Sequence, residues 1–525
     1  MPFPASAPTL HDPWEEVQID LPKRGAAITP TRDKNYPEWY LQVISAADLA
    51  DQSPVRGCMV VRPWGYGIWE EIQNNYNPIL RRHGVQNASF PMFIPLSFFE
   101  KEAAHAEGFA KEVAVVTHRR LVQNGEGKLV PSSPLEEPLV VRPTSEMIIG
   151  DSFSRWVQSH RDLPLLVNQW CSVVRMEMRT RPFLRTAEFL WHEGHSVHAS
   201  SEDAMRHTMA MLQGYKSFMQ EVLAIPVIDG EKLASERFAG AEQTFTVEAM
   251  MQDGKALQAG TSHYLGQNFA KASVIQFQNK TGQLEHAYTT SWGMSSRLIG
   301  ALVMTHGDDD GLRVPPRVAP AHVVILPIQG GENHGQVHEY AERVRTELER
   351  LQYHGQPLRV HLDNRDLRGG DKNWQWIKKG APLRLEIGKR EQAVGSMTLL
   401  RRDKGHTDRV TIPLCDAPTL IPFILDTIQA GYFKEASERM QRNTREDVTT
   451  LKELLELFTP HPTTGKRAHE GFVKAFFDGE TNDLRPLDPL GLSVRCVPLS
   501  DQAAEGRCII TGKSTKQRVI IARAY

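Results

Sequence analysis

Four arginines crowd one short stretch of this sequence, and binding an anion is the chemistry that they favour. Residues 167–198 read VNQWCSVVRMEMRTRPFLRTAEFLWHEGHSVH. A guanidinium group is a rigid fork of donors that matches a phosphate or a carboxylate. The four are Arg175, Arg179, Arg181 and Arg185. For a single arginine, an internal ion pair of Arg175 with Glu177 or Glu193 remains the simpler alternative.

Two strands joined by a charged hairpin loop are expected in this stretch. On a strand, side chains alternate between the two faces of the sheet. On the outgoing strand, residues 167–178, one face then carries Arg175, Glu177 and Arg179. On the return strand, residues 188–197, one face carries Trp191, Glu193 and His195. Charged groups held in a sheet need a ligand or an ion pair to compensate them, so this pattern predicts a site.

Three histidines in the return strand could be taken for a metal site. They lie three residues apart, at His192, His195 and His198. That spacing suits one face of a helix, but on a strand it puts His192 and His195 on opposite faces. The sequence therefore disfavours a metal cluster here.

Two further segments carry polar residues suited to a binding site. VVRPTSE, residues 140–146, places two hydroxyls and a carboxylate directly after a proline. QAGTSHYLGQNF, residues 258–269, combines small and polar side chains with two glycines. The first could simply begin a helix, with Thr144 or Ser145 as its cap. The second could be a turn followed by a surface strand.

Three ordered motifs resemble those of class II aminoacyl-tRNA synthetases, most closely the prolyl-tRNA synthetases. The 175–195 segment, R-x-E followed by FLRTAEFLWHEGH, is similar to their motif 2. GVQNASFPMFIP, from Gly84, resembles motif 1 with its proline at Pro91. SWGMSSRLIGALVMTHGDDDGLRVPPRVAP, from Ser291, resembles motif 3, whose arginine would be Arg297. The similarity extends over nearly the whole chain and is weakest in the first 30 or so residues.

The resemblance implies a proline pocket and an adjoining ATP site. The proline-binding residues would be Thr144, Glu146, Arg175, Trp191, Glu193, His195 and His263. The ATP-binding residues would be Arg175, Glu177, Phe183, Arg185, Thr186, Gln258, Thr261, Ser295 and Arg297, with Phe183 stacked on adenine. Mg²⁺ would arrive with ATP and lie near Gln258, and Arg175 and Arg297 would be the catalytic residues. No Walker A loop, G-x-G-x-x-G or G-x-S-x-G motif offers another site.

The activity implied is that of a proline–tRNA ligase, with proline, ATP and the proline tRNA as substrates. Phe109 and Glu112 resemble family residues near the tRNA end, and Glu386, Lys389 and Arg390 are candidates for reading the anticodon. Residues 356–404 hold 12 Lys or Arg against 6 Asp or Glu, a basic stretch suited to RNA. A solvated helix face would explain that charge equally well.

Fold class follows from the order of the expected elements. We expect a multidomain α/β and α+β protein: an N-terminal lead-in (1–34), a class II catalytic domain built on an antiparallel sheet (35–316), an α/β anticodon-binding domain (317–431) and a small α+β C-terminal unit (432–525). The linker before the second domain is marked by Pro315, Pro316 and Pro320. Strands alternating with helical stretches favour a mainly parallel sheet in the anticodon-binding domain.

Composition bounds the remaining possibilities. The 525 residues carry a net charge of −2, are 40% hydrophobic and include five cysteines without a C-x-x-C pair. These values exclude a disulfide scaffold and a wholly disordered chain. With neither a signal peptide nor a long apolar run recognisable, we expect a cytoplasmic protein without membrane association.

Three further expectations follow from the resemblance. The space between motifs 2 and 3 is too short for an editing insertion, which indicates the archaeal/eukaryote-like branch. Many relatives hold zinc in the last domain, but near Cys508 a threonine, Thr511, stands where a thiolate would be needed, so no zinc is expected. Motif 1 implies a homodimer, and the terminal Tyr525 could point toward the active site.

Two alternatives remain. A related synthetase, for threonine or histidine, is disfavoured by the WHEGH and VVRPTSE segments. A synthetase-like tRNA-binding or regulatory protein without ligase activity would be expected to have lost its phosphate-binding arginines. Arg175, Arg185 and Arg297 are all present.

Overall fold

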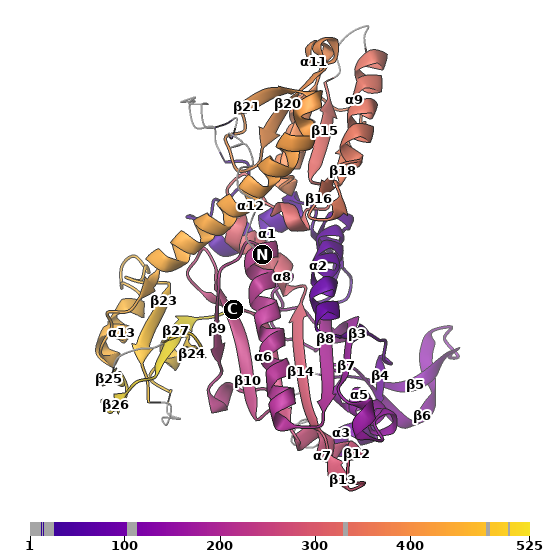
Figure 1. The fold of residues 1–525 in the computed structure, drawn as a ribbon, viewed down its shortest axis with the longest axis vertical. Helices are drawn as coiled ribbons and strands as arrows, with labels where there is room; N and C mark the ends of the chain where they lie inside the picture. Colours follow the sequence, from indigo (N-terminus) through magenta and orange to yellow (C-terminus); the bar gives the residue numbers. More distant parts are fainter. Residues whose placement is uncertain are drawn as a thin grey trace.

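The structure, a computed structural model, describes Asp12, Trp14 and residues 26–101, 113–328, 334–478, 484–501 and 505–525. Figure 1 shows a central sheet, an upper α/β unit and a small unit beside the sheet, with the long helix α12 (Ala417–Arg442) running between the last two. Within the described residues, no helix combines the length and apolar character needed to cross a bilayer.

The central sheet has eleven strands. In spatial order they are β22 (Thr444–Arg445), β23 (Phe472–Phe476), β27 (Arg518–Arg523), β24 (Leu492–Pro498), β9 (Val227–Glu231), β10 (Gln243–Met250), β11 (Ala256–Gly266), β14 (Tyr288–Ser295), β8 (Glu188–His198), β7 (Leu165–Val174) and β3 (Gln86–Asn87). The stretch from β9 to β7 is antiparallel throughout. The expected antiparallel catalytic core is therefore confirmed.

Helices cover one face of this sheet and leave the other for a site. The covering helices are α1 (Tyr36–Ala46), α2 (Pro63–Arg82), α6 (Ser201–Ser217) and α8 (Arg297–His306). Their apolar side chains form the largest core with residues such as Val247 and Leu257 of the sheet. Ser200 directly precedes α6, and its hydroxyl caps the helix by accepting from the backbone N–H of Asp203.

The upper unit is an α/β domain with a mixed sheet of five strands. Their order is β18 (Val360–Leu362), β15 (Val323–Pro327), β19 (Leu383–Ile387), β20 (Ser396–Arg401) and β21 (Arg409–Pro413). The first three are parallel, as expected, and the last two are antiparallel. Its helices include α9 (His334–Glu349), α10 (Gly369–Lys379) and α11 (Lys389–Val394). Trp14, from the expected lead-in, is buried in the core of this unit.

One helix differs from the expectation. The anticodon-binding domain is expected to end at residue 431, but its last helix, α12, continues to Arg442. A single glycine costs a helix only about 1 kcal/mol, and Tyr432 and Ala436 beyond it are buried. α12 therefore leads without interruption into the last unit, which contains α13 (Leu451–Phe458) and strands β22, β23, β24 and β27.

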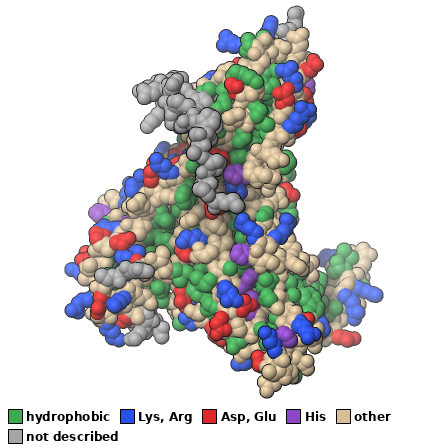
Figure 2. Space-filling view, in the orientation of Figure 1, with side chains coloured by type: hydrophobic (Ala, Val, Ile, Leu, Met, Phe, Trp, Pro, Cys, Tyr) green, Lys and Arg blue, Asp and Glu red, His purple; other side chains and the backbone are tan. Residues whose placement is uncertain are grey.

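A β-ribbon projects from the side of the catalytic unit (Figure 1). It consists of β5 (Ala114–Gln123) and β6 (Leu129–Val141), with the short β4 (Phe93–Pro95) paired to the base of β6. Leu121 and Leu129 are exposed on it. Figure 2 shows hydrophobic and basic side chains next to one another on this ribbon.

Candidate active site

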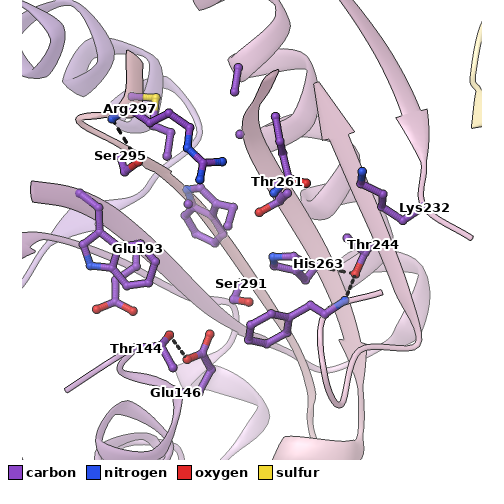
Figure 3. A pocket seen from close by; sticks show the side chains of 18 of the residues that line it. Thr144, Glu146, Glu193, Lys232, Thr244, Thr261, His263, Ser291, Ser295 and Arg297 are labelled. Atoms are coloured by element: carbon purple, nitrogen blue, oxygen red, sulfur yellow. Dashed lines mark hydrogen bonds between the residues drawn. The ribbon is translucent and has the colours of Figure 1, made fainter. Parts of the chain in front are cut away.

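A cavity of about 280 Å³ opens on the face of the central sheet that the helices leave free (Figure 3). Strands β8, β10, β11 and β14 form its walls, and the start of α5 (Glu146–Trp156) closes one end. Eleven residues expected to bind substrate line it: Thr144, Glu146, Arg175, Trp191, Glu193, His195, Gln258, Thr261, His263, Ser295 and Arg297. Three of them, Trp191, Glu193 and His195, lie on one face of β8, as expected from strand alternation.

Glu193 is the centre of a buried hydrogen-bond network at one end of the cavity. Its carboxylate accepts from the backbone N–H of Ser145 at 3.1 Å, from Gln169 Nε2 at 2.7 Å and from the hydroxyl of Ser145. His195 Nε2 lies 3.1 Å from Oε2, the oxygen that also accepts from the backbone N–H of Ser145. Although burial opposes ionisation, His195 and these donors hold the pKa of Glu193 below its ordinary value. The carboxylate is therefore charged and fixed in place.

The pKa values of two histidines of the cavity are shifted in opposite directions. Burial favours a neutral His195, but its hydrogen bond to Glu193 and the charges of Glu146 and Glu193 outweigh burial and raise the pKa of His195. Burial and the nearby His195 lower the pKa of His263 to about 3. His263 is thus a neutral imidazole, with its Nδ1 3.1 Å from Thr244 Oγ1. Phe238 packs against its ring, with centroids 4.6 Å apart.

The VVRPTSE segment both begins a helix and faces the cavity. Glu146 is the first residue of α5, as a helix start would predict. Thr144 donates a hydrogen bond to the Glu146 carboxylate, and both side chains are buried at the cavity wall. The two interpretations of the segment are therefore compatible, since the turn before the helix aims a hydroxyl and a carboxylate at the same space.

Two arginines supply positive charge to the cavity, and Arg297 lies at the end away from Thr144 and Glu146. Arg175 donates from Nε to the carbonyl of Pro143 at 3.1 Å and lies over the rings of Phe189 and Trp191. Arg297 donates from Nε to the carbonyl of Leu184 at 3.0 Å, and its guanidinium extends into the cavity (Figure 3). Burial and the charge of Arg175 lower the pKa of Arg297. Both cations are held by backbone carbonyls.

The outgoing strand is shorter than expected. β7 ends at Val174 instead of continuing to Met178, so the expected common face of Arg175, Glu177 and Arg179 does not form on a strand. Residues 175–187 form a loop closed by a bridge between Arg181 and Arg185. The loop follows from local hydrogen bonding that strand alternation cannot predict: the Arg181 N–H donates to the Arg185 carbonyl at 2.6 Å.

Four expected ATP contacts lie in this loop, outside the cavity lining. Arg185 forms an ion pair with Glu177, with 2.7 Å between Nε and Oε2. Thr186 is buried with its hydroxyl unpartnered. Phe183 has a positive φ of 60° and its ring is packed in the core under the sheet, so this structure does not offer it for stacking on adenine. Burial of this aromatic ring in the apolar core is itself favourable, so the ring is held away from the cavity.

The candidates for tRNA contacts are more dispersed. Phe109 and Glu112 lie outside the described residues. Glu386, on β19, pairs with Arg409 at 3.1 Å. Lys389 and Arg390 are exposed in the first turn of α11, next to the carboxyl end of that strand. The three candidates therefore lie at one end of the upper unit's sheet.

Several lining residues were not singled out from the sequence. They include Lys232, Arg237, Phe238, Thr244 and Ser291. The antiparallel pairing of β10 with β11 places Thr244 opposite His263, whereas Lys232, Arg237 and Phe238 lie in the connection between β9 and β10. A signal existed, because GEKLASERFAG, residues 230–240, runs from the end of β9 toward β10 and resembles the synthetase family. Its individual residues could not be assigned without the register.

Comparisons with known proteins agree with this geometry. Residues 129–306 match the tRNA synthetase class II core domain (G, H, P, S and T), and residues 322–422 match the anticodon binding domain. The proline–tRNA ligase of Protochlamydia amoebophila is 55% identical over 96% of this chain and 99% of its own. Proline–tRNA ligase 2 of Anaeromyxobacter dehalogenans is 54% identical, over 95% and 98%. The chain belongs to the proline–tRNA ligase family.

A solved structure of this family extends the agreement to the fold. Prolyl-tRNA synthetase from Cryptosporidium parvum, complexed with halofuginone and AMPPNP, superposes with a TM-score of 0.84 and 34% sequence identity. The match covers 95% of this chain and 97% of that one. The fold expected of a prolyl-tRNA synthetase is thereby confirmed.

Proposed function

We propose that this chain is a proline–tRNA ligase, which activates proline with ATP and transfers the prolyl group to the 3′ end of the proline tRNA. The observation that carries the proposal is the division of the cavity: buried acceptors lie at one end and Arg297 at the other, and Arg175 is held by the Pro143 carbonyl next to the acceptors. The acceptors suit the cationic nitrogen of an amino acid, and the arginines suit its carboxylate and the phosphates of a nucleotide. Membership of the family supports the assignment.

At the acidic end, the residues suit the ring nitrogen of proline. This nitrogen is a cation with two protons, and the Thr144 hydroxyl and the Glu146 carboxylate are two acceptors side by side. Trp191 offers an apolar surface for the small ring, with Glu193, His195 and His263 behind it. The proline carboxylate then points toward Arg175.

At the basic end, ATP would bind with its α-phosphate near Arg175 and Arg297. A carboxylate oxygen of proline attacks the α-phosphorus, the bond to the bridging oxygen of the β-phosphate breaks, and pyrophosphate leaves. The arginines offset the charge of the transferring group, with contributions from Gln258, Thr261 and Ser295. The loop residues Glu177, Arg185 and Thr186 would reach the nucleotide only if the loop moves.

The active site and the C-terminal unit differ in how well their side chains suit a metal ion. The amide oxygen of Gln258 and the ATP phosphates are hard oxygen donors that suit Mg²⁺, which supplies further charge neutralisation when bound. The C-terminal unit offers a poorer set for zinc. The Thr511 hydroxyl donates to Asp478, and the Cys508 sulfur accepts from the backbone N–H groups of Ile510 and Thr511. We propose that this unit is stable without zinc.

The remaining partners rest on the upper unit and the ribbon. We propose that the 3′ end of the tRNA approaches near Phe109 and Glu112, and that the anticodon is read by the end of the sheet that carries Glu386, Lys389 and Arg390. A homodimer formed around motif 1 would shelter the apolar side chains of the neighbouring ribbon. We place this enzyme in the cytoplasm, without editing of mischarged tRNA in cis.

Amino-acid-dependent ATP–pyrophosphate exchange without tRNA tests the assignment. We expect strong exchange with proline, weak exchange with alanine, and none with threonine or histidine. Alanine should be active at a low level because a smaller side chain is rejected by only about 1–3 kcal/mol. No exchange with any amino acid, from folded protein with Mg²⁺ present, would contradict the proposal and favour a tRNA-binding protein without ligase activity.

A further inference from the structure

The C-terminal unit is joined directly to the catalytic sheet. β24 pairs antiparallel with β9, Val497 opposite Glu231 and Pro498 opposite Gly230. A Cβ atom at Gly230 would lie 2.6 Å from both the Cβ of Cys496 and the carbonyl oxygen of Val497. Only glycine allows this approach without displacing backbone. The side chains of β24 are therefore held at a fixed distance from those of β9 and β10.

One side chain of β24 reaches into the catalytic unit. Arg495 binds the Glu248 carboxylate from β10 with both ends of its fork: Nε lies 3.2 Å from Oε2, and Nη2 lies 3.1 Å from Oε2 and 3.3 Å from Oε1. Glu248 is fully buried and Arg495 is 9% exposed. A buried bidentate pair of this kind fixes geometry as well as charge.

Glu248 has a second cationic partner, which lines the active site. Lys232 Nζ donates to Glu248 Oε1 at 2.9 Å, and the Thr246 hydroxyl donates to the same oxygen at 3.1 Å. Lys232 follows β9 and belongs to the cavity wall, near Thr261 in Figure 3. Two cations therefore share one carboxylate, and the group keeps one net positive charge beside the cavity.

The position of this group points to the nucleotide and not to proline. Glu248 lies directly opposite Gln258 in the pairing of β10 with β11, and Gln258 is at the basic end of the cavity. Glu193 and His195 are on β8, which is separated from β10 by β11 and β14. An excess positive charge at this place is complementary to a polyphosphate.

We propose that Arg495 is a positioning residue for ATP binding: by sharing Glu248 with Lys232, it leaves the ammonium group of Lys232 available to the ATP phosphates. The inference rests on the proposed ligase function. Without Arg495, the buried Glu248 carboxylate would be balanced by Lys232 alone, and the wall would become neutral. The C-terminal unit thus contributes to nucleotide affinity through a residue that does not touch the nucleotide.

The test compares Arg495→Met with Arg518→Met in the full-length chain. Arg518 belongs to the same unit and binds Asp501 with 2.6 and 2.8 Å contacts, and Glu446 at 2.8 Å, far from the cavity lining. For Arg495→Met we expect the KM for ATP in pyrophosphate exchange to rise about tenfold, the loss of roughly one charge-assisted contact. The KM for proline and kcat should stay within about twofold, and Arg518→Met should leave all three unchanged.

A double variant separates charge balance from simple damage. In Arg495→Met/Glu248→Gln no carboxylate competes for Lys232, so the KM for ATP should return to within about threefold of the wild-type value. If Arg495→Met does not fold, Arg495→Lys keeps the charge without the fork and should raise the KM for ATP about threefold. An unchanged KM for ATP in the folded single variant, a parallel rise in the KM for proline, or no recovery in the double variant would overturn the proposal.

Direct binding keeps this test separate from the ligase assignment. Calorimetric titration with ATP and Mg²⁺ should give the same order of affinities: wild type and Arg518→Met together, and Arg495→Met about tenfold weaker. Wild-type protein that binds ATP but shows no exchange with proline would contradict the proposed function alone. Equal ATP affinity in wild type and Arg495→Met would contradict the role of Arg495 alone.

Discussion

The two faces of β8 carry similar residue types and differ in what surrounds them. On the cavity face, His195 Nε2 lies 3.1 Å from Glu193 Oε2, and this contact raises the pKa of His195. On the opposite face, His192 lies under α6 with Nδ1 2.7 Å from Asn168 Oδ1 and Nε2 3.0 Å from the Tyr215 hydroxyl. Burial lowers the pKa of His192 to about 3, so it is neutral. The imidazole that bonds to the Glu193 carboxylate has a raised pKa, and the one that bonds to an amide and a hydroxyl has a lowered pKa.

The covered face also shows why hydrogen-bond geometry alone does not define a site. Ser196 Oγ lies 2.8 Å from His198 Nε2, and His198 Nδ1 lies 2.6 Å from Asp203. This is the arrangement of a Ser-His-Asp triad. Ser196 has no exposed surface, however, and its hydroxyl is also 2.5 Å from Thr290 Oγ1. No substrate can reach it, so these bonds stabilise the packing of α6 on the sheet.

If the cavity face serves binding, Glu193→Ala should have the largest effect on activity. The change leaves the donors of Ser145, Gln169 and His195 without their acceptor, at a cost of about 3 kcal/mol. We expect kcat/KM for proline to fall about 100-fold. Pyrophosphate exchange per folded molecule measures it, and Glu193→Gln, which keeps the shape, should lose less. Equal activity in Glu193→Ala and Glu193→Gln would contradict the role of the Glu193 hydrogen bonds on the cavity face.

If the covered face serves stability, Gly194→Ala should destabilise the fold. A Cβ at Gly194 would overlap the Trp292 indole, which must then move. Overpacking of this kind costs about 1–3 kcal/mol. Urea unfolding should show the loss, and Gly395→Ala, an equally small change at a glycine with open space around it, controls for the added methyl. That control carries its own backbone strain because its φ is 68°.

His192→Leu should lower the stability of the fold and leave its activity nearly unchanged. It leaves the Asn168 oxygen and the Tyr215 hydroxyl unpaired, which costs about 2 kcal/mol in the free energy of unfolding. The kcat/KM for proline, measured on folded protein, should stay within about twofold because the ring does not face the cavity. A loss of activity as large as that of Glu193→Ala would show that the two faces are not independent.

The last expected effect is a pH dependence of stability that has opposite signs on the two faces. The pKa of His195 is raised above its ordinary 6.5, so its stabilisation is complete below pH 6.5 and is lost as the pH rises through the raised value. The pKa of His192 is lowered to about 3, so the fold loses stability as the pH falls from 6.5 toward 3. A tenfold difference in proton affinity between the folded and unfolded states corresponds to about 1.4 kcal/mol.

Urea unfolding across this pH range, compared between wild type, His195→Gln and His192→Leu, measures the two slopes. The difference between wild type and His195→Gln should shrink with rising pH, and that between wild type and His192→Leu should shrink with falling pH. Two slopes of the same sign would mean that the contact of His195 with Glu193 does not distinguish the faces.

What the sequence could predict follows from local rules. Alternation along β8 correctly grouped Trp191, Glu193 and His195, because a period of two needs no knowledge of distant residues. The loop after β7 escaped that rule, since its shape depends on remote partners: Arg181 lies over the rings of Tyr40 and Tyr525. Lys232 was missed for the same reason, because its role depends on Glu248 and on Arg495 of another unit.

The pairing of β24 with β9 has a consequence for how the chain is made. Without β24, β9 would be an edge strand of the catalytic sheet, with a row of backbone N–H and C=O groups open to pairing with another molecule. In the chain, β24 follows β9 only after the whole upper unit. During translation the catalytic unit therefore carries an open edge until β24 has emerged, and chains truncated before β24 should be prone to aggregate.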